Sequence, residues 1–214
     1  MKLGTLNLEN QYILAPMQNV TTGPYRRFIR TFYNVGLVSV PMLYIKRIVK
    51  NPKSIEFELY RIEEENPISI QLIGNDPNAL RKAIDHLESY NFDALDINAG
   101  CPSKRAIKAK EGGYLMKDLE TLGKIINNAV KFSSKPVSLK IRTGFIKPLN
   151  IDKMAKLVNN SGIDFLIIHA RPVKSKYNLG SLDLETVKKL KEKISVPLVG
   201  NGDIRNPINA KYFK

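Results

Sequence analysis

Two residues in this sequence carry reactive side chains in runs where such side chains are uncommon. Lys140 lies in PVSLKIRTG, an apolar, β-branched run in which an unpaired ammonium is costly to bury. We interpret it either as a lysine that reaches water at a strand end or as a fixed cation facing an anionic or electron-rich ligand. His169 ends the run FLIIH and Arg171 follows it, so the two could bind a phosphate; a structural histidine is the alternative.

A second group of candidates surrounds the single cysteine. Cys101 lies in ALDINAGCPSKR, in a loop after an apolar run. Its thiol could donate a proton, because a free thiol has a pKa of about 8.5. A small core side chain is the alternative interpretation. Asn98 and Gln71 lie near run ends, where their amides could bind the edge of a planar heterocycle or bridge the backbone of two strands.

Short apolar runs position these residues, and each has the character of a strand buried on both faces of a parallel sheet. The seven runs are Tyr12–Pro16, Leu37–Pro41, Ile68–Leu72, Ala94–Asn98, Val137–Ile141, Phe165–His169 and Pro197–Gly200. Segments with helical spacing lie between them, namely Pro77–Tyr90, Leu119–Phe132, Ile151–Ser161 and Leu184–Ile194. This alternation predicts an α/β protein.

The distribution of polar residues favours a (β/α)8 TIM barrel over an open doubly wound sheet. No GxGxxG motif follows the first run, which argues against a dinucleotide-binding sheet. Polar or reactive residues lie at or beyond the carboxyl ends of most runs: Met17, Gln71, Asn98, Cys101, Lys140, Arg142, His169, Asn201, Gly202 and Asp203. In a barrel these ends converge on one mouth that holds the active site, whereas an open sheet spreads them along a line.

Composition sets broad limits on the function. The chain has 34 Lys+Arg against 20 Asp+Glu, a formal net charge of +14, which is typical of a nucleic-acid-binding protein or of lysine-rich helix surfaces. The basic group at 104–110 is expected in a loop beside the cysteine, and the glycines at 112–113 could allow backbone to approach a ligand closely. The 43% hydrophobic and 25% charged residues are ordinary for a globular chain and exclude a disordered one.

Other classes of protein are disfavoured by what the sequence lacks. It has no stretch of about 18 apolar residues, so we expect no membrane span, and its start lacks the apolar region of a secretory signal. One cysteine cannot form a disulfide framework or a Cys-based zinc site, so we expect no metal and a reducing, cytoplasmic location.

Taken together, these segments resemble the tRNA-dihydrouridine synthase family. The matching stretches are LAPMQNVTTGPYRRFIR (14–30), PISIQLIGNDPNAL (67–80), FDALDINAGCPSKR (92–105), PVSLKIRTGF (136–145), GIDFLIIHAR (162–171) and VPLVGNGDI (196–204). Their order and spacing hold along most of the chain, and INAGCP, KIRTG and NGDI are specific as a set. The sequence departs from the family pattern at Thr21-Thr22, where Thr-Asp is usual, and in the segment VPMLY after the second run.

The resemblance implies an FMN-dependent TIM barrel that reduces uridine in tRNA to 5,6-dihydrouridine, with NADPH reducing the flavin. It implies a hydride from the flavin to uracil C6 and a proton from Cys101 to C5. The positions that it assigns to the cofactor are Pro16 and Met17 at the flavin ring, Gln71 and Lys140 at its polar edge, His169 at the phosphate, and Asn201, Gly202 and Asp203 along the ribityl chain. Those that it assigns to the substrate are Asn98 and Arg142 at the uracil and Lys104 and Arg105 at the flanking phosphates.

Two other functions stay open at this point. One is a flavin-dependent paralogue that reduces a free pyrimidine or another small molecule, and the other is a non-catalytic RNA-binding remnant. The length bears on this choice, because a complete barrel takes about 250 residues. We expect residues 1–214 to form a flavin-binding barrel domain that is truncated after its seventh strand, without the C-terminal RNA-binding helical domain of the family. Alternatively, an oligomer partner closes the barrel. An open barrel would expose a sheet edge and apolar helix faces.

Overall fold

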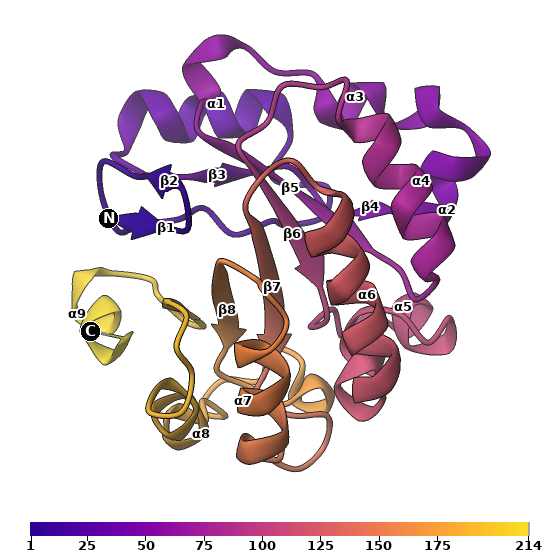
Figure 1. Cartoon of the computed structure of the whole chain (residues 1–214). Coiled ribbons are helices and arrows are strands. Elements are labelled where there is room, and N and C mark those ends of the chain that lie inside the picture. Colours follow the sequence, from indigo (N-terminus) through magenta and orange to yellow (C-terminus); the bar gives the residue numbers. More distant parts are fainter. Residues whose placement is uncertain (214) are drawn as a thin grey trace.

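The parallel strands of this chain curl around a common axis, with helices on their outer side (Figure 1). The computed structural model describes residues 1–213, except for the side chains of Pro207 and Tyr212. The strands are β1 (Lys2–Leu3), β2 (Leu6–Asn7), β3 (Val38–Ser39), β4 (Leu43–Tyr44), β5 (Ile68–Ile73), β6 (Ala94–Asn98), β7 (Val137–Arg142), β8 (Phe165–His169) and β9 (Leu198–Asn201).

Most helices connect one parallel strand to the next. The α-helices are α1 (Gly23–Phe32), α2 (Ile45–Lys50), α3 (Glu56–Leu59), α4 (Pro77–Leu87), α5 (Lys104–Lys108), α6 (Leu119–Phe132), α7 (Ile151–Asn159), α8 (Leu184–Lys191) and α9 (Pro207–Ala210). Short 3-10 helices span Pro52–Ile55, Glu63–Glu65, Gly112–Lys117, Val173–Ser175 and Lys211–Phe213. Lys214, the last residue of the segment expected to form a seventh barrel helix, lies outside the described residues.

The main sheet is parallel throughout and follows the order β3-β5-β6-β7-β8-β9, with β4 also paired to β5. Neighbours in the sheet are successive strands of the chain, and the connecting helices lie on one side, which is the arrangement of a (β/α)8 barrel. The predicted fold class is therefore confirmed. The strands at 94–98 and 165–169 and the helix at 119–132 have the predicted bounds.

The expected strand at 12–16 is much shorter than predicted. Only Ile13 pairs, through an isolated parallel bridge to Leu37. Pro16 has no backbone N–H for a ladder, and the chain then turns, with the Met17 N–H donating to Thr21 Oγ1 at 3.1 Å. This bridge nevertheless places the segment beside β3, in the first position of the barrel.

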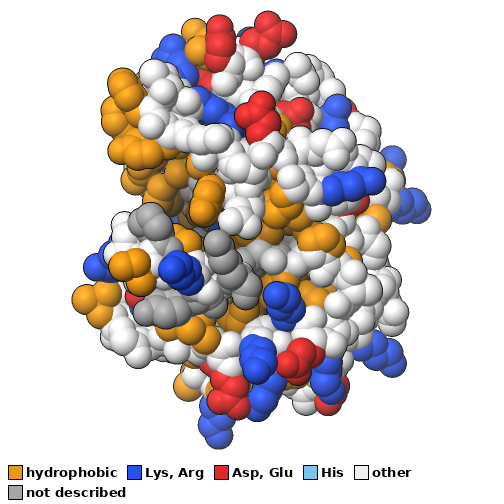
Figure 2. All heavy atoms as spheres, turned by 90° about the vertical axis from the view of Figure 1, so that its left-hand side faces the viewer, with side chains coloured by type: hydrophobic (Ala, Val, Ile, Leu, Met, Phe, Trp, Pro, Cys, Tyr) orange, Lys and Arg blue, Asp and Glu red, His pale blue; other side chains and the backbone are white. Residues whose placement is uncertain are grey.

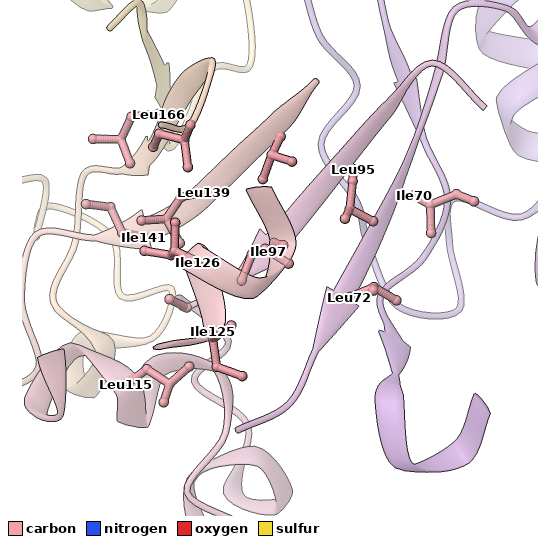
Figure 3. Packing of buried hydrophobic residues seen from close by; sticks show 14 of the residues in the cluster. Ile70, Leu72, Leu95, Ile97, Leu115, Ile125, Ile126, Leu139, Ile141 and Leu166 are labelled. Atoms are coloured by element: carbon pink, nitrogen blue, oxygen red, sulfur yellow. The ribbon is translucent and has the colours of Figure 1, made fainter. Parts of the chain in front are cut away.

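Alternation along the strands separates a polar interior from an apolar exterior. Outward residues, such as Leu95 and Ile97 of β6, pack with residues of β5 and β7 and with Ile125 and Ile126 of α6 in one buried cluster (Figure 3). The residues between them face the barrel axis. Asp96 therefore points inward, and the charged residues of these strands belong to the interior.

The amino-terminal ends of the strands form a closed floor. The hairpin β1–β2, which the sequence analysis did not predict, packs its Leu3 into a small buried cluster with Leu8, Leu37, Phe165 and Ile167. At this end the carboxylate of Asp164 accepts a hydrogen bond from the Val137 N–H at 2.8 Å, and that of Asp93 accepts from the Ile68 N–H at 2.7 Å. Apolar packing and these hydrogen bonds hold the strand starts together at this end of the barrel.

The sheet has an edge at β9, and its residues are more exposed than those of the central strands. All four residues of β9 are half-buried, whereas all six of β5 are buried. Aromatic side chains of α1 are exposed as well, including Phe32 at 67%. Figure 1 shows both termini on this side of the molecule, and Figure 2 shows hydrophobic side chains gathered there. An exposed sheet edge and an apolar helix face are what an open barrel was expected to show.

Candidate active site

A cavity of about 1090 Å³ opens at the carboxyl ends of the parallel strands. All the residues to which the family resemblance assigned catalysis, cofactor binding or substrate binding line it. These are Pro16, Met17, Gln71, Asn98, Cys101, Lys104, Arg105, Lys140, Arg142, His169, Asn201, Gly202 and Asp203. Segments that lie almost 190 residues apart in the sequence therefore meet at one site, as the barrel prediction required.

Strand register explains this convergence. Asn98 of β6 lies opposite Lys140 of β7. One layer further toward the mouth, Arg142 of β7 lies opposite His169 of β8, which lies opposite Asn201 of β9. Residues at paired positions point to the same side of a sheet, so these five side chains form two stacked layers around the barrel axis.

The side chain of Lys140 points into the barrel interior, where it is half-buried and lines the cavity. Its Nζ donates to Asn201 Oδ1 at 3.4 Å, and burial lowers the pKa of Lys140 to about 8. The Asp96 carboxylate on the neighbouring strand opposes this shift, because an opposite charge favours the ammonium. Of the two interpretations from the sequence, this placement favours the fixed cation facing the cavity.

Asp96 is the main site residue that the sequence analysis missed. It is 2% exposed, and it accepts from Gln71 Nε2 at 2.6 Å and from Ser138 Oγ at 2.7 Å. Burial raises the pKa of Asp96 to about 6, although both hydrogen bonds and Lys140 oppose that rise. The signal was present in the sequence, since Asp96 in ALDIN is a charged residue within an apolar strand, as Lys140 is in VSLKI.

The loop after β6 is held by the amide at its start. Asn98 Oδ1 accepts from the backbone N–H of Gly100 at 3.0 Å and of Cys101 at 2.9 Å. The Cys101 thiol is half-buried, lines the cavity and lies 3.4 Å from Ser103 Oγ. The Gly113 N–H donates to the Cys101 carbonyl at 3.0 Å, so the glycines at 112–113 bring backbone close to this loop and not to a ligand.

Most of the basic group next to Cys101 is helical, although we expected a loop: helix α5 covers Lys104–Lys108, and Lys110 lies in the turn that follows. Ser103 accepts from the Ala106 N–H and begins helix α5, as serine commonly does at a helix N-terminus. Lys104 is exposed at the cavity rim, and the Arg105 guanidinium lies 4.2 Å from the centroid of the Tyr44 ring. Tyr44 was not predicted as a site residue.

Arg142 connects two loops of the mouth. Its Nε donates to the Gly100 carbonyl at 2.9 Å, and its Nη1 donates to the Lys176 carbonyl at 2.6 Å. Its guanidinium also lies 5.1 Å from the centroid of the exposed Tyr177 ring. The side chain therefore fixes the Cys101 loop relative to the loop after β8, whichever ligand it also contacts.

The expected pairing of His169 with Arg171 at a phosphate needs correction. Arg171 is fully buried, and its guanidinium is bound by the carboxylate of Asp203 and by the Asn178 carbonyl, the latter at 2.9 Å. It is thus a structural cation that holds the turn after β9. Its Nη1 lies 3.3 Å from His169 Nε2. Burial and the neighbouring cations lower the pKa of His169 to about 3, so the imidazole is neutral at physiological pH.

Comparison with known proteins identifies the family. The family model described as dihydrouridine synthase (Dus) matches residues 13–213. This chain belongs to the Dus family. The resemblance drawn from the sequence motifs is thereby confirmed.

Relatives of this Dus chain include tRNA-modifying enzymes by name. The tRNA-dihydrouridine synthase B of Pasteurella multocida is 34% identical over 99% of this chain and 64% of its own length. A probable tRNA-dihydrouridine synthase of Rickettsia bellii is 32% identical over 99% of this chain and 65% of its own length. The Dus chain therefore spans just under two thirds of the length of these relatives.

Solved structures with the same fold include an old yellow enzyme homologue from Zymomonas mobilis, with a TM-score of 0.64 and 11% identity over 100% of this chain and 85% of that one. A morphinone reductase in complex with tetrahydroNAD has a TM-score of 0.63 at 11% identity, over 99% of this chain and 81% of that one. At such identity the likeness concerns the fold alone. In residues 1–213 of the Dus chain, no helix is long and apolar enough to cross a membrane, and no group of three or more metal-ligating side chains occurs.

Proposed function

We propose that this chain is the flavin-binding barrel domain of an enzyme that reduces uridine in tRNA to 5,6-dihydrouridine. The observation that carries the proposal is the convergence of a half-buried cation, two buried amides and a thiol on one cavity in a member of the Dus family. The tRNA substrate is consistent with the names of its relatives. Its site of action would be the cytoplasm, where tRNA is used.

The cavity fits FMN in size and in chemistry. Its volume of about 1090 Å³ slightly exceeds the usual range for small-molecule sites, about 300 to 1000 Å³, so it has room for a cofactor and a base. Pro16 and Met17 would line the flavin ring, while Gln71 and Lys140 would contact its polar edge. An ammonium whose pKa has fallen to about 8 is stabilised by a nearby anion, so Lys140 suits a cofactor that becomes more negative on reduction.

The phosphate end of the cofactor would lie toward β8 and β9. The neutral imidazole of His169 would donate its ring N–H to the phosphate. Asn201, Gly202 and Asp203 would lie along the ribityl chain. Asp203 already binds Arg171, so the proposed contribution of this turn to the cofactor comes chiefly from its backbone. When bound, FMN would supply the hydride for a carbon–carbon double bond, and NADPH would be the reductant.

The protein's own chemical step would be a proton transfer. Cys101 lines the cavity on a loop held by Asn98 and Arg142, and its thiol would deliver a proton to C5 of the uracil ring. Asn98 and Arg142 would orient that ring. Both side chains already bind the loop of Cys101, so the same groups would align the base and the acid.

The rim would contact the RNA around a flipped base. A uridine inside folded tRNA has to leave its stack to reach such a cavity, and cations near the mouth would bind the flanking phosphates. Lys104 and Arg105 lie at the rim, and the net charge of +14 favours binding to a polyanion.

The purified chain provides the test. We expect visible flavin absorbance, release of FMN on denaturation, and a mass gain of two hydrogens per modified uridine when unmodified tRNA is incubated with protein and NADPH. A Lys188→Ala variant, which changes an exposed side chain of α8 away from the cavity, should behave like the wild type in all three measurements. A colourless protein that binds tRNA would indicate a non-catalytic RNA-binding module, and reduction of free pyrimidines but not of tRNA would contradict the assigned substrate.

A further inference from the structure

Buried side chains connect the barrel interior to the loop of Cys101 through continuous hydrogen bonds. Ser138 Oγ donates to Asp96 Oδ1 at 2.7 Å, and Gln71 Nε2 donates to Asp96 Oδ2 at 2.6 Å. Asn98 Nδ2 donates to Gln71 Oε1 at 2.8 Å, and Asn98 Oδ1 accepts the backbone N–H of Cys101 at 2.9 Å. We call the path from Asp96 through Gln71 and Asn98 to Cys101 the amide relay.

The two ends of the amide relay fix the direction of every bond within it. An ionised carboxylate can only accept, and a backbone N–H can only donate. Gln71 must therefore turn its NH₂ toward Asp96 and its carbonyl toward Asn98, and Asn98 must turn its NH₂ toward Gln71. A flip of either amide would set two donors or two acceptors against each other in a buried site, which is costly.

We propose that Asp96 is a positioning residue: its carboxylate sets the orientation of the Gln71 and Asn98 amides, and through them the geometry of the Cys101 loop. Both amides line the cavity, so the relay also decides which polar atoms face a ligand there. Its effect on catalysis rests on the proposed function, but the hydrogen-bond geometry does not.

Asp96 is well suited to this role because its surroundings leave it few other partners. Its neighbours are the hydroxyl of Ser138 and the ammonium of Lys140 on β7 and the amide of Gln71 on β5; Lys140 is the charged group acting on it. Burial raises the pKa of Asp96 to about 6, so the carboxylate predominates at neutral pH and titrates in an accessible range.

The first experiment follows these groups by NMR in the wild-type chain of residues 1–214. We expect the side-chain amide of Gln71 and the backbone N–H of Cys101 to shift with a common midpoint near pH 6. The Ile68 N–H, which donates to Asp93 at the closed floor, is the internal reference for a carboxylate outside the relay. A Gln71 resonance that titrates while Cys101 does not would overturn the proposal, because the coupling would then stop before the loop.

The second experiment compares variants by the rate at which iodoacetamide alkylates Cys101. Asp96→Leu removes the acceptor, and we expect the loosened loop to react about tenfold faster, the factor that corresponds to one lost hydrogen bond to a charged group. Asp96→Asn can keep a carbonyl toward Gln71 and an NH₂ toward Ser138, so we expect it to stay within about twofold of the wild type. Asp93→Asn, three residues earlier and outside the amide relay, is the matched control and should react at the wild-type rate.

Two safeguards keep the outcomes distinct. If Asp96→Leu does not fold, Gln71→Met interrupts the relay one residue later and should give the same faster alkylation. Equal rates for Asp96→Leu or Gln71→Met and the wild type would refute the positioning role. Neither experiment needs flavin or tRNA, so a relay that behaves as expected in a chain that reduces no tRNA would count against the proposed function alone.

Discussion

The floor and the mouth of the barrel use aspartate in different ways. At the floor, Asp93 and Asp164 accept backbone N–H groups of the preceding strands, at 2.7 and 2.8 Å, and so connect the starts of adjacent strands. Three residues beyond Asp93, Asp96 accepts side-chain donors inside the barrel, from Gln71 and Ser138. A hydrogen bond from a backbone N–H connects one strand to its neighbour, whereas a side-chain donor such as the Gln71 amide can also face a ligand in the cavity. The position of a carboxylate along the strand thus decides whether it joins strands or builds a site.

The largest effect should come from the mouth, at Cys101. If its thiol delivers the proton, Cys101→Ala should lower the rate of tRNA reduction about 1000-fold while leaving flavin content and stability close to the wild type. The measurement is single-turnover formation of dihydrouridine, with bound flavin determined by absorbance. An unchanged rate would remove the acid role from Cys101 and weaken the contrast between mouth and floor.

A substitution at the floor should lower the stability of the fold and leave the reactivity of the mouth unchanged. Phe165 is fully buried in the cluster beneath the barrel, so Phe165→Ala should cost about 4 kcal/mol of unfolding free energy through lost burial and a new cavity. At low temperature, where Phe165→Ala should still be folded, the reactivity of Cys101 should match that of the wild type. Denaturant unfolding checks the first part and the alkylation rate of Cys101 the second. A large change in that rate would show that floor and mouth are not independent.

The pH dependence of stability should separate Asp96 from its counterpart at the floor. Because the folded state raises the pKa of Asp96 from 3.8 to about 6, the folded chain holds this proton more tightly than the unfolded chain does. The resulting stability is complete below pH 4 and is lost as the pH rises through 6, an amount of about 3 kcal/mol. The stability of Asp96→Asn relative to the wild type should therefore increase by up to that amount between pH 4 and pH 7.

Denaturant titrations at several pH values measure this difference. Asp93→Asn, which keeps an acceptor for the Ile68 N–H, should stay within about 1 kcal/mol of the wild type. If the stability of Asp96→Asn relative to the wild type did not change between pH 4 and pH 7, the carboxyl would not be held in the low-dielectric environment described above.

The smallest effect should come from the rim. Lys104 is exposed beside the cavity, and Lys104→Ala should reduce the slope of log Kd against log salt for tRNA by about one unit if its ammonium binds a phosphate. Lys188→Ala, on the outer surface of α8, should leave the slope unchanged. Equal slopes for the two variants would place the RNA elsewhere than at the mouth.

The sequence predicted those parts of the molecule where local pattern and burial agree. The strands at 94–98 and 165–169 are buried runs rich in apolar residues, and the helix at 119–132 is capped by Asp118, whose carboxylate accepts from the Thr121 N–H. Convergence of the site residues also followed from sequence, because the ends of parallel barrel strands meet at one mouth.

What the sequence did not predict depends on partners that are distant in the chain. The role of Arg171 is set by Asp203, 32 residues later, so the sequence alone suggested a phosphate where the guanidinium binds a carboxylate. The short pairing at Ile13 depends on Leu37 and on the turn at Thr21. Asp96 was overlooked although, like Lys140, it is a charged residue within an apolar strand. Lys140 was selected as a candidate because a lysine in such a strand is more conspicuous.

The most direct test of the central claim is a single-turnover experiment on the chain reduced with NADPH under anaerobic conditions. Mixing with tRNA that lacks dihydrouridine should restore the visible absorbance of oxidised flavin and form dihydrouridine in equal amount, while fully modified tRNA should restore none. Flavin that stays reduced with unmodified tRNA, or that is reoxidised equally by both RNAs, would contradict the assignment of the mouth as the site of uridine reduction.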